Sequence, residues 1–146
     1  MTERVTYAMV LKQPWARLVA EGVFPILIRR MNTRIRGRVA ILANGRDQDA
    51  VVDGTPPKPE DFPDKAVIGS VRINDSIAVN LQDLPKLLEE RYGKDFAKFY
   101  PKQYIPEKSP VFLWTLSDPR LSARPKPFNP GPGIHVWVRM PEKWQF

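Results

Sequence analysis

The chain has 146 residues, of which 42% are hydrophobic, and it carries a formal net charge of +7 with an isoelectric point near 9.9. This length and composition fit one globular domain over residues 1–146 and exclude an intrinsically disordered chain. The absence of cysteine excludes disulfide bonds, thiolate metal sites and cysteine nucleophiles, and it is typical of the reducing cytoplasm. The sequence also lacks a signal-peptide pattern and any apolar run of the roughly 20 residues that a membrane-spanning helix requires.

Positive charge is concentrated in the first third of the chain. Residues 1–46 contain nine lysines and arginines but only two carboxylates, Glu3 and Glu21. The next segment, residues 47–65, reverses the balance with six carboxylates against two lysines. Dense uncompensated arginines indicate an anionic partner such as a nucleic acid, although a solvated basic surface would have the same composition.

The first third predicts a strand, a short helix and two further strands. Residues 5–11 are β-branched and aromatic, which favours a strand. Pro14 fits the first turn of a helix that ends at Gly22, with Ala20 on the side away from its apolar stripe. Residues 26–28 are apolar and predict the second strand, and Arg38 followed by the apolar run 39–43 predicts the third, over residues 38–43.

The middle of the chain predicts a long loop followed by a strand. Residues 44–65 are polar and rich in Asp, Pro and Gly, so we expect a flexible acidic loop at the surface. Residues 66–73, with the sequence AVIGSVRI, predict the next strand. Gly69 lies inside this strand and is expected to mark a β-bulge.

The second half predicts two helices and a central strand. Asp83 is placed to cap a helix over residues 84–92, and a shorter helix is expected over residues 94–99. The sequence VFLWTL, residues 111–116, is apolar on both faces and predicts a strand in the middle of a sheet. Residues 118–133 contain five prolines and are expected to wrap the surface as an irregular segment.

A final strand is expected over residues 134–140, which brings the total to about six strands and two or three helices. These elements do not alternate regularly along the chain, which argues against a doubly wound parallel sheet. We therefore predict an α+β fold, a small mixed and mostly antiparallel β-barrel or sheet with the helices at its rim.

Five motifs, in order along the chain, resemble the ASCH domain of the PUA-like superfamily. They are LKQPWARLVAEG, RGRVAI, KAVIGSVRI, VFLWTLSDPRL and GIHVW. The resemblance covers nearly the whole chain and implies a PUA-like barrel with a cleft between the barrel and the first helix. It also implies a ligand that is RNA or a nucleotide-like fragment of it.

Some ASCH-domain proteins are enzymes that hydrolyse acylated cytidine or cleave RNA. The amidohydrolase pattern has a Lys and a Thr just after the glycine that ends the first helix. Here Gly22 is followed by Val23, Phe24 and Pro25, so neither catalytic group is present. These departures argue against an inherited amidohydrolase activity and favour a binding protein over an enzyme.

The candidate binding residues lie in the strand-to-helix turn and in the arginine-rich segment that follows. Arginine suits phosphate because its guanidinium group is planar, offers bidentate donors and stays charged. Lys12 could hold a phosphate and Gln13 could contact a base edge, whereas Trp15 heads the apolar stripe of the helix and is expected in the core or on the floor of the cleft. The predicted nucleic-acid-binding residues are Lys12, Gln13, Trp15, Arg29, Arg30, Arg34, Arg36, Arg38 and Asn44.

Other side chains that could support chemistry have simpler explanations. Trp114 and Trp137 lie in apolar strands, so core packing is the expected role of both. His135 is the single histidine, and without cysteine or a second histidine it forms neither a catalytic triad nor a usual metal site. The aspartates of residues 44–65 suit a solvated loop better than a magnesium site. We therefore expect no metal and no cofactor.

Three functions remain open from the sequence. The first is binding of RNA or other single-stranded nucleic acid in a cationic cleft, with no membrane partner. The second is an enzyme acting on RNA or on a modified nucleoside, with Lys12 and an acid of residues 47–64 as its candidate catalysts. The third is a protein-interaction module whose basic face meets an acidic partner. The sequence does not determine the oligomeric state.

Overall fold

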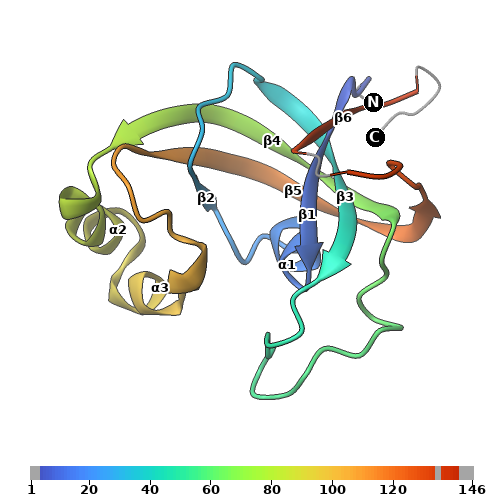
Figure 1. Cartoon of the computed structure of the whole chain (residues 1–146), viewed down its shortest axis with the longest axis horizontal. Helices are drawn as coiled ribbons and strands as arrows, with labels where there is room; N and C mark the ends of the chain where they lie inside the picture. Colours follow the sequence, from blue (N-terminus) through green and yellow to red (C-terminus); the bar gives the residue numbers. More distant parts are fainter. Residues whose placement is uncertain (1–3, 134–135, 142–146) are drawn as a thin grey trace. The chain divides into compact units, whose positions relative to one another are not determined.

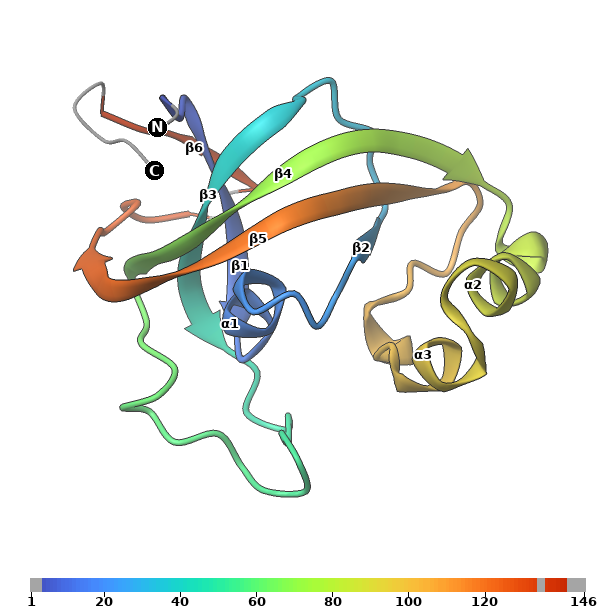
Figure 2. The same ribbon diagram turned by 180° about the vertical axis from the view of Figure 1, so that it is seen from behind.

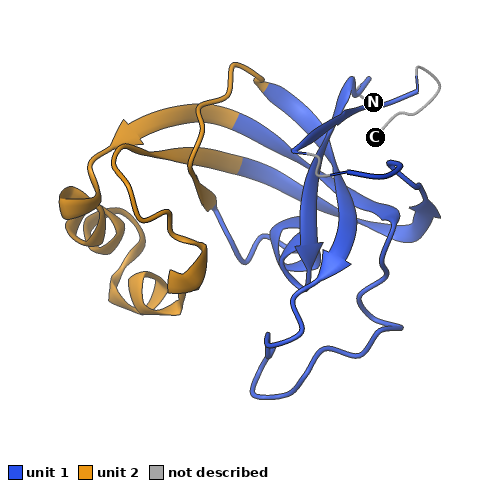
Figure 3. Ribbon diagram, viewed as in Figure 1, with its two compact units in different colours: residues 1–25, 37–73, 117–146 blue, residues 26–36, 74–116 orange. Residues whose placement is uncertain are grey.

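The computed structural model describes residues 4–133 and 136–141, and it divides into two compact units (Figures 1 and 3). Unit 1 comprises the described residues of Met1–Pro25, Gly37–Ile73 and Ser117–Phe146. Unit 2 comprises Ile26–Arg36 and Asn74–Leu116. Both units are discontinuous in sequence, because two long strands run from one unit into the other.

The described strands form one six-stranded sheet with the order β2-β5-β4-β3-β1-β6. The strands are β1 (Tyr7–Gln13), β2 (Ile26–Arg29), β3 (Gly37–Arg46), β4 (Ala66–Val79), β5 (Val111–Pro127) and β6 (Trp137–Arg139). β1 and β3 are parallel, whereas the pairs β1–β6, β2–β5 and β3–β4 are antiparallel. The predicted α+β class with a mixed, mostly antiparallel sheet is therefore confirmed.

Three short α-helices accompany the sheet in the described residues. They are α1 (Trp15–Ala20), α2 (Leu84–Tyr92) and α3 (Lys94–Phe99), together with the 3-10 turns η1 (Leu81–Asp83) and η2 (Lys102–Tyr104). The bounds of α2 and α3 agree with the prediction. Asp83 occupies the N-cap position of α2, but its side chain makes no capping hydrogen bond, so that detail of the prediction was wrong. No helix in the described part of the chain is long and apolar enough to span a membrane.

The largest error of the sequence prediction concerns the segment after the central strand. Residues 118–127 are not an irregular wrap, because β5 continues without a break to Pro127. β4 likewise extends six residues beyond the predicted end, to Val79. The last strand includes Trp137–Arg139, whereas residues 134 and 135, including His135, lie outside the described residues.

In unit 1, α1 packs against β1 and β3, as Figures 1 and 2 both show. Ala20 is buried rather than outward-facing, because its methyl group meets β4 at Gly69. The register between β3 and β4 shifts beside Gly69, which confirms the predicted bulge. A Cβ atom at Gly69 would lie 2.2 Å from the carbonyl oxygen of Arg120 and 3.1 Å from the Ala20 Cβ. Glycine therefore permits the close approach of β4 and β5.

Unit 2 is organised around Trp114 and Tyr100. Trp114 is fully buried, as predicted, and its Nε1 donates a hydrogen bond of 3.0 Å to the Met31 carbonyl. The Tyr100 hydroxyl accepts a hydrogen bond of 2.8 Å from the backbone N–H of Ile28 in β2. Tyr92, Phe96 and Tyr100 form a continuous series of ring contacts that joins α2 to the end of α3.

Candidate nucleic-acid interface

The turn between β1 and α1 is fixed by Gln13. This side chain is only 1% exposed, its Oε1 accepts a hydrogen bond of 3.1 Å from Arg17 N, and its Nε2 donates one of 2.9 Å to the Pro63 carbonyl. Gln13 thus orders the first turn of α1 and attaches the long loop to it. Both polar ends of the amide are occupied within unit 1, so reading a base edge would require these two bonds to exchange.

Lys12 and Asn44 lie where the parallel strands β1 and β3 end. The pairings of Leu11 with Ala43 and of Gln13 with Arg46 place Lys12 beside Gly45 across a register shift. The Lys12 Cγ lies 3.7 Å from the position that a Gly45 Cβ would occupy. Lys12 is exposed, while Asn44 and Arg46 are half-buried. This end of the sheet therefore carries an exposed amine on β1 and a half-buried amide and guanidinium group on β3.

Trp15 lies at the first position of α1 and is half-buried. Its ring stands edge-on to Phe24 with centroids 5.9 Å apart, and its Nε1 donates a hydrogen bond of 3.4 Å to Asp47 Oδ2. The indole is held on both its apolar and its polar side. This arrangement gives Trp15 a structural role and leaves part of one ring at the surface.

Arg17 connects α1 to the acidic loop, although the sequence did not single it out. Its Nη1 donates to the Asp61 carbonyl, its Nε pairs with Glu21, and its guanidinium carbon lies 5.1 Å from the centroid of the buried Phe62 ring. A pocket of about 390 Å³ lies beside this contact, lined by Arg17, two carboxylates and residues of β5. None of the nine predicted binding residues lines this pocket. Its carboxylates, Glu60 and Asp61, make it less suitable for an anion than a purely basic site.

Arg38 is one of the predicted phosphate-binding residues, but its side chain is fully buried. Its guanidinium group donates hydrogen bonds to Ser70 Oγ at 2.9 Å and to the Asp118 carbonyl at 3.1 Å, and it forms an ion pair with the Asp118 carboxylate. Arg38 therefore joins β3, β4 and β5. A buried guanidinium group needs such partners, because an unpaired charge in the interior costs several kcal/mol.

The other predicted arginines belong to unit 2 and have unequal environments. Arg29 is half-buried, with its guanidinium carbon 5.1 Å from the Trp114 ring centroid, and burial lowers the pKa of Arg29 below its ordinary value. Arg36 donates to the backbone carbonyls of Thr33 and Ile35 and pairs with Asp75 at 3.4 Å. Arg30 and Arg34 are exposed, and neither is paired with a carboxylate in the described part of the chain.

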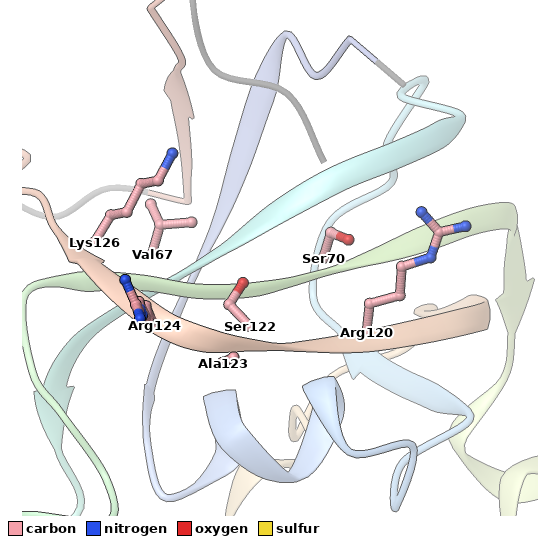
Figure 4. Close-up of a pocket in the computed structure, with 7 residues that line it drawn as sticks. All are labelled: Val67, Ser70, Arg120, Ser122, Ala123, Arg124 and Lys126. Atoms are coloured by element: carbon pink, nitrogen blue, oxygen red, sulfur yellow. The ribbon is translucent and has the colours of Figure 1, made fainter. Parts of the chain in front are cut away.

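A second pocket, of about 290 Å³, lies in unit 1 over β4 and β5 (Figure 4). Its charged lining residues are all basic: Arg120, Arg124 and Lys126. The sequence prediction missed these residues because three prolines in the same segment suggested an irregular wrap. The detectable signal was the alternation of Arg120, Ser122, Arg124 and Lys126, since polar side chains at every second position are typical of one face of a strand.

Among the residues that the structure describes, no group of three or more His, Cys, Asp or Glu side chains is placed to hold a metal ion.

Comparison with known proteins identifies the fold through solved structures. No family model matches the chain, and no curated protein matches it. Among solved structures, the crystal structure of ASCH from Zymomonas mobilis superposes with a TM-score of 0.60 at 16% sequence identity, covering 97% of this chain and 91% of that chain. Structures of two single-site mutants of the same Z. mobilis protein each give a TM-score of 0.58, also at 16% identity. They cover 93% and 97% of this chain and 90% and 92% of theirs. The ASCH resemblance read from the sequence motifs is therefore confirmed at the level of structure: the chain has an ASCH-domain fold.

Proposed function

We propose that the protein binds RNA or another single-stranded nucleic acid through its exposed basic side chains. The observation that carries the proposal is that Lys12, Arg30 and Arg34 are exposed and unpaired with any carboxylate in the described residues. Arg29 and Arg38, in contrast, are engaged within the fold. Exposed cations without counter-charges are the groups that phosphate binding uses, because each contact releases condensed counterions from the nucleic acid.

Two further facts support this function. The net charge of +7 favours association with a polyanion, and the resemblance of the sequence motifs to the ASCH domain implies an RNA or nucleotide-like ligand. The cations fall in both units, with Lys12 in unit 1 and Arg30 and Arg34 in unit 2. Lys12 and the pair of arginines are therefore two separate contributions to binding, and each can be tested by mutation.

The test is a titration of a fluorescein-labelled ten-nucleotide oligouridylate at a series of salt concentrations. We expect binding that weakens as salt increases, with a slope of log K against log salt of about −0.7 for each phosphate contacted. The triple variant Lys12→Ala, Arg30→Ala and Arg34→Ala should lower the magnitude of that slope by about 2.

The matched control is the triple variant Lys86→Ala, Lys94→Ala and Lys98→Ala on α2 and α3. It removes the same charge from exposed positions, two of which lie within 4 Å of Glu90 and Glu89. An equal loss in both triple variants would mean that only net charge matters. Absence of binding to any RNA or single-stranded DNA at low salt would contradict the proposed function.

The alternatives have different signatures in the same experiment. Shortening of the labelled RNA would assign an enzymatic function instead. Binding to an acidic peptide that persists after nuclease treatment, without binding to RNA, would assign a protein-interaction function.

A further inference from the structure

The second half of β5 presents a row of basic side chains on one face. Arg120, Ser122, Arg124 and Lys126 occupy every second position, so their Cα atoms repeat at roughly 6.6 Å along the strand. Figure 4 shows Arg120, Ser122 and Lys126 extending from β5 on the same side as Val67 and Ser70 extend from β4. These residues line the pocket of about 290 Å³, and we call the three cations the β5 basic row.

The charge of this pocket is positive. No carboxylate is among its lining residues. The neighbouring Asp118 accepts a hydrogen bond of 3.0 Å from Arg120 Nη2, but the same carboxylate oxygen also pairs with the buried Arg38. One carboxylate thus serves two guanidinium groups, which orients Arg120 without cancelling its charge. An anion in the pocket would meet a local excess of cations.

The pocket also has a fixed hydroxyl donor. Ser70 is 1% exposed, and its Oγ accepts a hydrogen bond of 2.9 Å from Arg38 Nη1. A serine hydroxyl that accepts from a guanidinium group keeps its own O–H to donate. Because Ser70 lines the pocket, that donor is available to an oxygen placed there. Arg38 therefore contributes to the pocket indirectly, by holding the Ser70 hydroxyl in place.

The second half of β5 is accessible from one edge. The pairing of β2 with β5 ends at Thr115, so among the described strands residues 117–127 have β4 as their only neighbour. Lysines, arginines and prolines on a sheet edge also prevent edge-to-edge aggregation, which is the competing explanation. Edge protection, however, requires neither a pocket nor the inward hydroxyl of Ser70. Both features favour a ligand.

From this arrangement we propose that the β5 basic row binds the phosphodiester backbone of the nucleic acid, a proposal that rests on the function proposed above. Successive phosphates of an extended single strand are spaced similarly to alternate residues of a β-strand. Arg120, Arg124 and Lys126 therefore each contact a backbone phosphate, and Ser70 and Ser122 donate to the phosphate oxygens within the pocket. Such contacts carry no base information, so this surface binds independently of sequence.

The test compares the triple variant Arg120→Ala, Arg124→Ala and Lys126→Ala with the Lys86, Lys94 and Lys98 control in the oligouridylate titration. We expect the magnitude of the salt slope to fall by about 2 and the Kd at low salt to rise at least about tenfold, with little change in the control. An oligoadenylate of the same length should show the same loss. The single variant Arg124→Ala, at an exposed position, should lower the magnitude of the slope by about 0.7. This single variant replaces the triple variant in the test if the triple variant does not fold.

The outcomes separate this proposal from the function on which it rests. If the wild-type protein binds no oligonucleotide, the proposed function itself is wrong. If the wild type binds and the Lys12, Arg30 and Arg34 variant is weakened while the β5 variants keep wild-type affinity and slope, only the β5 proposal is wrong. Unchanged RNA affinity together with self-association of the β5 triple variant in sedimentation velocity would assign the row to edge protection and would overturn the proposal.

Discussion

Arginines only eight residues apart in this chain have different roles because their surroundings differ. Arg30 is exposed, whereas Arg38 is enclosed by Ser70 and Asp118 with no exposed side-chain surface. Gln13 likewise has both ends of its amide bonded inside the protein. At this scale the type of side chain suggests a ligand, but burial and partners determine whether the side chain can reach one.

Tyr100 provides a pH-dependent test at the residue scale. Burial raises the pKa of Tyr100 above its ordinary value, and this outweighs the hydrogen bond from Ile28 N and the charge of Arg29, which lower it. Since an unfolded tyrosine ionises near pH 10, the unfolded state binds fewer protons than the folded state above about that pH. As far as Tyr100 is concerned, the free energy of unfolding should therefore not depend on pH below the pKa of the unfolded tyrosine. Above that pKa, the free energy of unfolding should fall as pH rises.

The variant Tyr100→Phe should remove this alkaline loss. It should also lower the free energy of unfolding at pH 7 by about 1–2 kcal/mol, because the buried Ile28 N–H loses its acceptor. Urea unfolding at pH 7 and at several values between about pH 9.5 and 11 measures both effects, with the exposed Tyr104→Phe as control. An unchanged alkaline slope in Tyr100→Phe would contradict the prediction.

At the scale of elements, the contact between β4 and β5 forms the pocket in unit 1. Gly69 lets the Arg120 carbonyl come close to β4, and the β-bulge beside Gly69 shifts the register with β3. The prolines at 119, 125 and 127 fit an edge, because proline cannot donate a backbone hydrogen bond to a neighbouring strand. The basic row therefore depends on a backbone approach that only glycine allows.

We expect Gly69→Ala to lower the free energy of unfolding by about 3 kcal/mol or more, because its methyl group would overlap the Arg120 carbonyl. The control is Gly54→Ala, where φ is +80° and no atom lies within 4 Å of the added methyl group. That change should cost only about 1 kcal/mol, through backbone strain alone. Urea denaturation of the two variants makes the comparison, and equal costs would show that β4 and β5 can separate without penalty.

At the scale of the whole molecule, the net charge of +7 combines cations that serve the fold with cations that face solvent. The described cations without carboxylate partners include Lys12, Arg30, Arg34 and Arg124. Binding that depends on such groups is electrostatic, varies steeply with salt and does not require a bound metal.

We accordingly expect oligouridylate binding to be unchanged by an excess of EDTA and not to be strengthened by added magnesium, which competes with lysine and arginine for the phosphates. The exposed lysine and arginine side chains, such as Lys12 and Arg30, carry the charge that contacts phosphate directly. Fluorescence anisotropy with and without EDTA measures binding, and gel electrophoresis of the same samples should show full-length RNA. Loss of binding in EDTA, or magnesium-dependent fragments, would contradict this expectation.

The sequence by itself determined several local elements and, through five ordered motifs, the fold. The helices at 84–92 and 94–99 and the bulge at Gly69 were predictable because their signals lie within a few neighbouring residues. The tertiary structure alone decided the roles of Gln13 and Arg38, whose partners lie 50 and 80 residues away. Residues 118–127 were expected to be irregular but form a basic strand, because pairing with β4 brings them into the sheet. Local propensity defines an element, whereas burial and long-range pairing decide which of its side chains a ligand can reach.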